Sequence, residues 1–61
     1  MKFRVWKVEF RMKDFDGLEL YCETLFKARS LKECQNHFLR RFAYVADRCI
    51  VDKFIDTGVM A

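Results

Sequence analysis

The sequence predicts an α+β domain in which one helix packs on a three-stranded antiparallel sheet. Residues 1–12 and 18–27 alternate between apolar and polar side chains, as half-buried strands do, with an Asp-Gly turn between them. Residues 28–47 follow the period of an amphipathic helix, and residues 48–57 are rich in β-branched and aromatic residues. We therefore expect the order strand, strand, helix, strand (ββαβ) in a single domain, residues 1–61.

The first strand has its apolar side chains at even positions from Trp6 to Met12, and charged residues lie between them. This alternation places the even-numbered side chains in the core and the charged ones outside. Phe3 and Val5 break the phase, because they share the charged side. Either a bulge lies near residues 5–6, or an apolar patch begins on the outer face.

The second strand can be aligned with the first because residues that face each other across a strand pair share a face of the sheet. A two-residue loop mixes the faces and is rejected. A five-residue loop, residues 13–17, pairs Met12 with Leu18 and sets Val5 opposite Leu25. A three-residue loop also keeps the faces, but it places Glu9 against Glu23. Because like charges repel there, we favour the five-residue loop.

The helix begins with Ser30-Leu31-Lys32-Glu33, which fits a capping box in which Ser30 and Glu33 bond each other's backbone N–H groups. The positions that follow repeat at spacings of three and four residues, and the segment contains neither Gly nor Pro. The apolar stripe consists of Leu31, Cys34, Phe38, Phe42 and Val45, widened by Leu39, Ala43 and Ala46.

The third strand, residues 48–57, has two competing inward sets. Cys49, Val51 and Ile55 form one set, and Ile50 and Phe54 form the other. A right-handed crossover makes this strand parallel to the second. Placing it beside the first strand makes every neighbour antiparallel, in the order 2-1-3. Residues from Gly58 onward are expected to fray.

The composition predicts a small folded domain, in which we expect neither a membrane span nor a leader peptide. The chain of 61 residues is 52% apolar, yet no apolar run approaches the ~18 residues of a membrane span. The charged N-terminus lacks a signal-peptide core, so a cytoplasmic location is expected (the host cytoplasm for a phage protein). The three separated cysteines, Cys22, Cys34 and Cys49, fit reduced, buried thiols better than disulfides.

The outer face of the sheet is the first candidate site, because one helix covers only one side. Val5 opposite Leu25, with Phe3 and Tyr21 nearby, would form a contiguous apolar patch among charges. Such patches often mark binding surfaces, here for a protein partner or for a second copy in a homodimer. An ordinary outer face, or a shifted register, is the alternative.

Residues that could carry catalysis or bind metal are few. Cys34 and His37 lie near each other on the helix, but a nucleophile pair also needs an orienting group and an oxyanion site. The cysteines and His37 are not spaced as a zinc site, and no glycine-rich phosphate loop exists. Asp14 and Asp16 are turn formers rather than a catalytic pair. We expect no metal, no cofactor and no enzymatic activity.

Basic residues on and around the helix are the second candidate site. The net charge of +3 is concentrated in residues 27–48, which contain six basic and two acidic residues. This segment could follow a nucleic-acid backbone through electrostatic contacts. No nucleic-acid motif accompanies it, and a solvated helix face explains the same charges. The candidate residues are Lys27, Arg29, Lys32, Arg40 and Arg41.

In length and element order, the chain resembles small phage proteins that act against host enzymes. Lys7-Val8-Glu9-Phe10 and Phe54-Ile55-Asp56 resemble the first strand and C-terminal region of the T-even phage antitoxin of host RNase toxins. The Asp-x-Asp-Gly hairpin at 14–17, with the following helix and strand, is similar to the phage uracil-DNA-glycosylase inhibitors. Those inhibitors are acidic DNA mimics, whereas this chain is basic.

The sequence therefore predicts a non-enzymatic protein-binding module, an inhibitor or antitoxin that blocks a host enzyme or toxin. The expected contact surface is the outer sheet face with Phe3, Val5, Tyr21 and Leu25. A nucleic-acid-binding module that uses the basic helix is the alternative.

Overall fold

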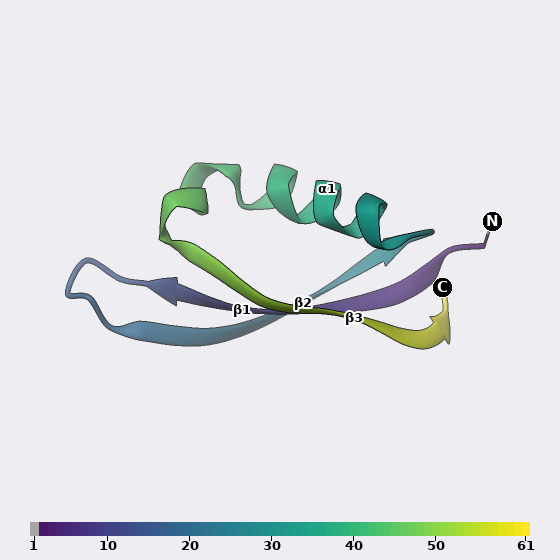
Figure 1. Ribbon diagram of the computed structural model, residues 1–61, viewed down its shortest axis with the longest axis horizontal. Coiled ribbons are helices and arrows are strands. Elements are labelled where there is room, and N and C mark those ends of the chain that lie inside the picture. Colours follow the sequence, from purple (N-terminus) through teal and green to yellow (C-terminus); the bar gives the residue numbers. More distant parts are fainter. Residues whose placement is uncertain (1) are drawn as a thin grey trace.

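The computed structural model describes residues 2–61 and confirms the three-stranded antiparallel sheet with one α-helix. The elements are β1 (Arg4–Lys13), β2 (Glu19–Ala28), α1 (Leu31–Arg41), the 3₁₀ helix η1 (Ala43–Arg48) and β3 (Cys49–Met60). β1 lies between the other strands, in the expected order 2-1-3. Both helices lie along one side of the twisted sheet, and the β1–β2 turn extends past them at one end (Figure 1).

The turn between β1 and β2 is organised by Asp14. Its carboxylate Oδ1 accepts the backbone N–H groups of Asp16 and Leu18, each at 2.9 Å. The backbone N–H of Asp14 donates to the Leu18 carbonyl at 3.0 Å, so these two residues still face each other. Gly17 has φ +82°, a conformation that favours glycine because other residues are hindered there by Cβ.

The predicted register between β1 and β2 is wrong by two residues. Met12 faces Leu20 instead of Leu18, and Glu9 faces Glu23, the arrangement that the sequence argument rejected. Lys7 makes this pairing of two glutamates acceptable, because its Nζ lies 3.6 Å from a Glu9 oxygen and 3.7 Å from a Glu23 oxygen. One cation between two carboxylates offsets the repulsion that a pairwise rule counts.

A register shift in β3 resolves the competition between its two inward sets. Phe10 faces Val51 and Glu9 faces Lys53, so Asp52 is an extra residue in β3. A bulge of this kind changes which side chains face the core along the rest of the strand. Consequently Cys49, Val51 and Phe54 pack against the core, and Ile50 and Ile55 lie on the outer face with their β1 partners.

The α-helix is shorter than the predicted stretch of residues 28–47. Ala28 instead ends β2 and is fully buried, where its carbonyl accepts the Trp6 Nε1–H at 3.1 Å. Ser30 is the N-cap as predicted, and its Oγ accepts the Glu33 N–H at 3.2 Å. At the other end α1 stops before Phe42, and the chain continues as the 3₁₀ helix η1.

The expectation that the chain frays from Gly58 onward is also wrong. β3 continues to Met60, and the Ala61 N–H donates to the Phe3 carbonyl at 3.1 Å. The Thr57 hydroxyl donates to the Val5 carbonyl at 2.7 Å. β1 is long enough to pair with these last residues of the chain, which the sequence pattern of β3 alone does not reveal.

The core lies between α1 and the inner face of β1. Its buried residues are Trp6, Val8, Phe10, Ala28, Cys34 and Phe38. Phe38 is the centre of an aromatic cluster, with ring centroids 4.8 Å from Phe42, 5.2 Å from Phe10 and 6.2 Å from Phe54. Stacked and edge-to-face rings at these separations add to the free energy gained from apolar burial.

Candidate partner-binding surface

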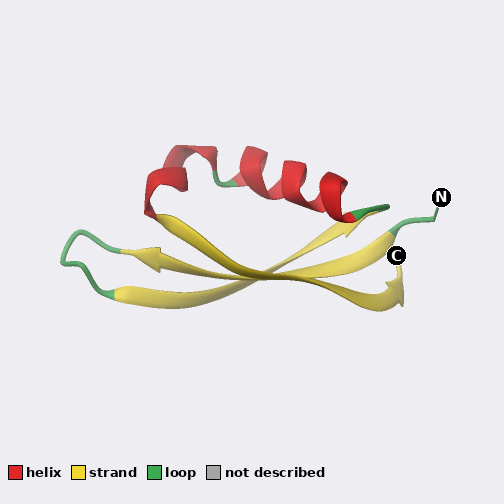
Figure 2. Cartoon of the chain, in the orientation of Figure 1, coloured by secondary structure: helices red, strands yellow, loops and turns green. Residues whose placement is uncertain are grey.

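The outer face of the sheet is the side away from the helices (Figure 2). Tyr21 and Leu25 are exposed there, with 83% and 63% of their surfaces accessible, while Val5 is half-buried. Phe3 is 45% exposed and precedes β1, where the Arg29 guanidinium lies 5.1 Å from its ring centroid. Phe3, Tyr21 and Leu25 are therefore accessible, and Val5 is the half-buried member of the predicted set. Phe3 lies against a basic residue outside the strands.

The corrected register breaks the predicted contiguous apolar patch. Leu25 faces Lys7 and Val5 faces Lys27, so Val5 does not lie opposite Leu25. The two apolar residues are diagonal neighbours, which are farther apart than directly opposed residues. Among the described residues, the surface is a mixture of single apolar side chains and charged ones rather than a broad apolar area.

Ion pairs organise the charged part of the outer face. Arg11 lies at its centre, with guanidinium nitrogens 3.0 Å from Asp52 on β3 and 3.2 Å from Glu19 on β2. Hydrogen bonds and charge from Asp52 first, and then from Glu19, raise the Arg11 pKa above its ordinary value. Arg11 thus links both edge strands to β1 and holds their carboxylates in fixed positions.

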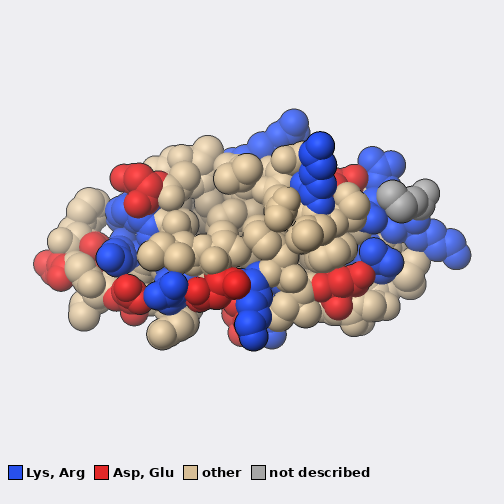
Figure 3. Space-filling model, viewed as in Figure 1, with Lys and Arg blue, Asp and Glu red and all other residues tan. Residues whose placement is uncertain are grey.

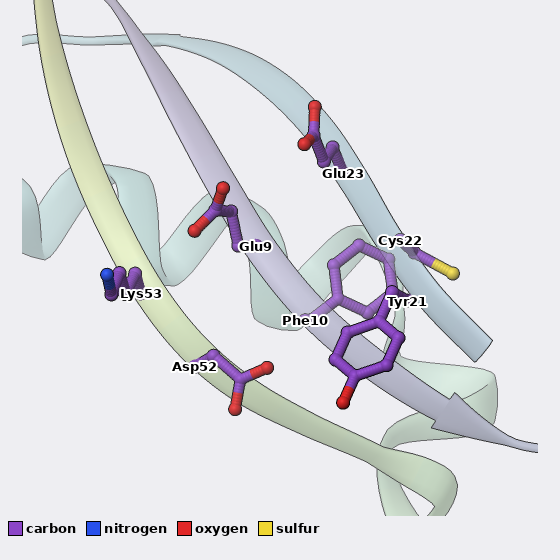
Figure 4. A pocket seen from close by; sticks show the side chains of 7 residues that line it. All are labelled: Glu9, Phe10, Tyr21, Cys22, Glu23, Asp52 and Lys53. Atoms are coloured by element: carbon purple, nitrogen blue, oxygen red, sulfur yellow. The ribbon is translucent and has the colours of Figure 1, made fainter. Parts of the chain in front are cut away.

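A shallow hollow of about 470 Å³ lies on this surface, between the charged side chains of the three strands. The Glu9, Glu23 and Asp52 carboxylates and the Lys53 ammonium line it together with Tyr21. Figure 4 shows these side chains on neighbouring strands, with the Tyr21 ring reaching over β1 in the view. The hollow offers hydrogen-bond acceptors beside one large exposed aromatic ring.

The five basic residues of the alternative site do not share one surface. Lys27 faces Val5 on the outer side of the sheet, and Arg29 forms an ion pair with Glu33 at 3.0 Å. Lys32 lies in the first turn of α1, while Arg40 and Arg41 lie in its last turn. Basic and acidic side chains are also interspersed on the side of the molecule in Figure 3. A single basic track is therefore not formed by this set.

Cys34 and His37 do not form a reactive pair. Cys34 is fully buried, and burial raises the pKa of its thiol. His37 stacks on Phe26 with a centroid distance of 6.1 Å, and its Nε2 lies 3.7 Å from a Glu33 oxygen. Cys49 is half-buried and its pKa is also raised, mainly by burial. Within residues 2–61, no cluster of three or more His, Cys, Asp or Glu side chains could hold a metal.

An apolar groove between the helices and β3 is a feature that the sequence reasoning missed. It has a volume of about 290 Å³, and its lining includes Phe38, Leu39 and Phe42 on the helix side and Val51 and Phe54 on β3. Leu39 is 61% exposed at its rim. The widened apolar stripe of the helix was the available signal, because an apolar arc wider than the sheet contact leaves some side chains uncovered.

Comparison of the chain with protein-family models, curated proteins and solved structures found no match. Among the described residues, neither the length nor the apolarity of any helix is sufficient for crossing a membrane.

Proposed function

We propose that this chain is a small non-enzymatic protein-binding module, an inhibitor or antitoxin that occludes the surface of a host enzyme or toxin. The chain acts as a ββαβ domain, whose helix leaves the far side of the sheet free for a partner. The observation that carries it is Tyr21, which is 83% exposed beside a hollow on that free side. Tyrosine is enriched among residues that dominate the binding energy of protein interfaces.

The hollow favours a partner that brings hydrogen-bond donors to it. Three carboxylates line it together with one ammonium group, that of Lys53. The Lys7 ammonium lies 3.6 Å from Glu9 and 3.7 Å from Glu23, two of these carboxylates. A partner side chain that carries an amide, an amine or a guanidinium can bond these carboxylates while Tyr21 packs on the surface beside it. The inhibitory role itself is supported by the resemblance to small phage inhibitors. An inhibitor of this kind acts by binding, so its contact surface is the part of the chain that carries the function.

A pull-down from host lysate with Tyr21→Asp and Leu25→Asp variants tests the proposal. We expect each variant to recover less partner than the wild-type chain, because a charge replaces an apolar contact in the interface. Tyr44→Asp is the matched control, since Tyr44 is 81% exposed on η1, away from the outer face. Unchanged recovery with Tyr21→Asp, in a folded variant, would overturn the proposal.

Nucleic-acid binding is the second candidate, supported by the exposed basic residues Lys32, Arg40 and Arg41 on α1. Titration against single- and double-stranded oligonucleotides at low and moderate salt tests it, because affinity from phosphate contacts is greatest at low salt. A folded chain that binds neither oligonucleotide at low salt excludes this candidate.

A further inference from the structure

The sequence along the free edge of β3 is complementary to a second copy of itself that runs in the opposite direction. β3 is an edge strand, since β1 occupies only one of its sides. Its centre reads Ile-Val-Asp-Lys-Phe-Ile, residues 50–55, with two apolar residues on each side of an acid and a base. An edge strand is a ready template for pairing with another strand.

The register shift in β3 makes this complementarity consistent with the faces of the sheet. In a regular strand Asp52 and Lys53 would point to opposite faces, so the two could not face each other across a twofold axis. With the extra residue, Val51 and Phe54 both lie on the inner face, and Ile50 and Ile55 both lie on the outer face. Residues that meet in a twofold pairing centred on the bulge therefore share a face.

Charge complementarity supports the same pairing. Centred between Asp52 and Lys53, the pairing sets each Asp52 opposite Lys53 of the second copy, twice in the dimer. Within residues 2–61, no acidic side chain lies within ion-pair distance of Lys53. Opposite charges directly across a strand pair are stabilising, and like charges there are destabilising.

The apolar groove lies beside this edge on the inner face. Val51 and Phe54 form its β3 side, and Leu39 lies on its helix side. A second copy paired along β3 would place its own Val51 and Phe54 next to these residues. The two helices would then lie on the same face of a six-stranded sheet, with the grooves adjoining across the twofold axis.

We propose that β3 pairs antiparallel with β3 of a second copy of this chain, centred on Asp52 and Lys53. The pairing sets Ile50 opposite Ile55 and Val51 opposite Phe54. It joins the two sheets edge to edge and covers the apolar grooves. Tyr21 and Leu25 lie on β2 at the other edge of the sheet, whereas Asp52 and Lys53 also line the hollow beside Tyr21.

A charge-exchange experiment read by sedimentation equilibrium tests the pairing. We expect the wild-type chain to be a dimer, and Lys53→Asp and Asp52→Lys each to weaken dimerisation by about tenfold or more, because like charges then face each other. A mixture of the two variants should form heterodimers, since each Asp faces a Lys again. A wild-type monomer across the micromolar to millimolar range would overturn the proposal.

Two further outcomes would also contradict it. A dimer that withstands Lys53→Asp but dissociates with Tyr21→Asp would place the interface on the outer face. If loss of the Arg11–Asp52 ion pair prevents Asp52→Lys from folding, single Ile50→Cys and Ile55→Cys variants provide the test. Under mild oxidation, in chains whose native Cys22 and Cys49 are replaced by Ser, a dimer linked through positions 50 and 55 should form when the two variants are mixed and not with either alone. Failure to link in the mixture would overturn the register.

Discussion

Ser30 fixes where the helix begins, and a single oxygen atom is responsible. Its Oγ accepts the Glu33 N–H at 3.2 Å, one of the first-turn donors that have no partner within the helix. We predict that Ser30→Ala lowers the free energy of unfolding by about 1 kcal/mol. Ser30→Asp should retain most of the stability, because a carboxylate oxygen can cap the same donor. Urea unfolding followed by Trp6 fluorescence measures both. An unchanged free energy of unfolding in Ser30→Ala would show that the cap contributes nothing.

The contribution of Glu33, in the first turn of the helix, to stability depends on pH. Burial by itself would raise the pKa of this carboxyl, but the hydrogen bond and charge of Arg29 outweigh burial, and the net pKa lies below the ordinary value of 4.5. A lowered pKa means that the ionised carboxylate stabilises the fold at neutral pH. That contribution is lost as pH falls below 4.5 and through the folded-state pKa.

We therefore predict that the stability difference between wild type and Glu33→Gln is largest near neutral pH and shrinks in acid. Thermal unfolding at a series of pH values measures this difference, with Glu19→Gln as a control at another paired carboxylate. A difference that stays constant from neutral to acidic pH would exclude the proposed role of Glu33 ionisation.

At the scale of elements, Phe38 joins the helix to all three strands. It is 4% exposed, and its ring contacts aromatic residues of β1, β2 and β3. We predict that Phe38→Ala lowers the free energy of unfolding by about 3–5 kcal/mol, a large part of what a small domain possesses. Leu39→Ala, at the exposed neighbouring position, should change it by less than about 0.5 kcal/mol in a monomeric sample. Denaturant unfolding of both variants tests this contrast.

The register of the hairpin depends on Lys7, which lies between Glu9 and Glu23. We predict that Lys7→Ala destabilises the fold by up to about 1 kcal/mol, because the two carboxylates are then opposed without a cation. Adding Glu23→Gln to that variant should recover the loss. High salt should reduce the effect, since it screens exposed charges. A salt-independent loss that Glu23→Gln does not recover would mean that Lys7 acts through packing.

The register and the helix end show where reasoning from sequence was insufficient. Alternation identified both hairpin strands and their inward faces, but choosing between two allowed registers required knowing that Lys7 reaches both glutamates. Likewise, periodicity continues from Phe38 past Phe42, so it could not reveal the change to a 3₁₀ helix. That change is visible at Phe42, whose φ of −111° and ψ of 20° are not helical. The β3 bulge likewise depends on pairing with β1.

At the scale of the whole molecule, the sheet order and the single covering helix were predictable, because they follow from the element order and the handedness of crossovers. The candidate surface was only partly predictable. The alternation placed Tyr21 and Leu25 on the outer face, where they are exposed. Their neighbours could not be predicted, since a shift of two residues keeps every face and changes every partner.

The most direct test of the central claim is site-specific photo-crosslinking in the cells that produce this protein. A benzoylphenylalanine residue replaces Tyr21 in one variant and the equally exposed Tyr44 in the other. If the outer sheet face binds a partner, irradiation should give one discrete crosslinked protein from position 21 and none of the same mass from position 44. The absence of an adduct at position 21, or the same adduct at both positions, would contradict binding through this face.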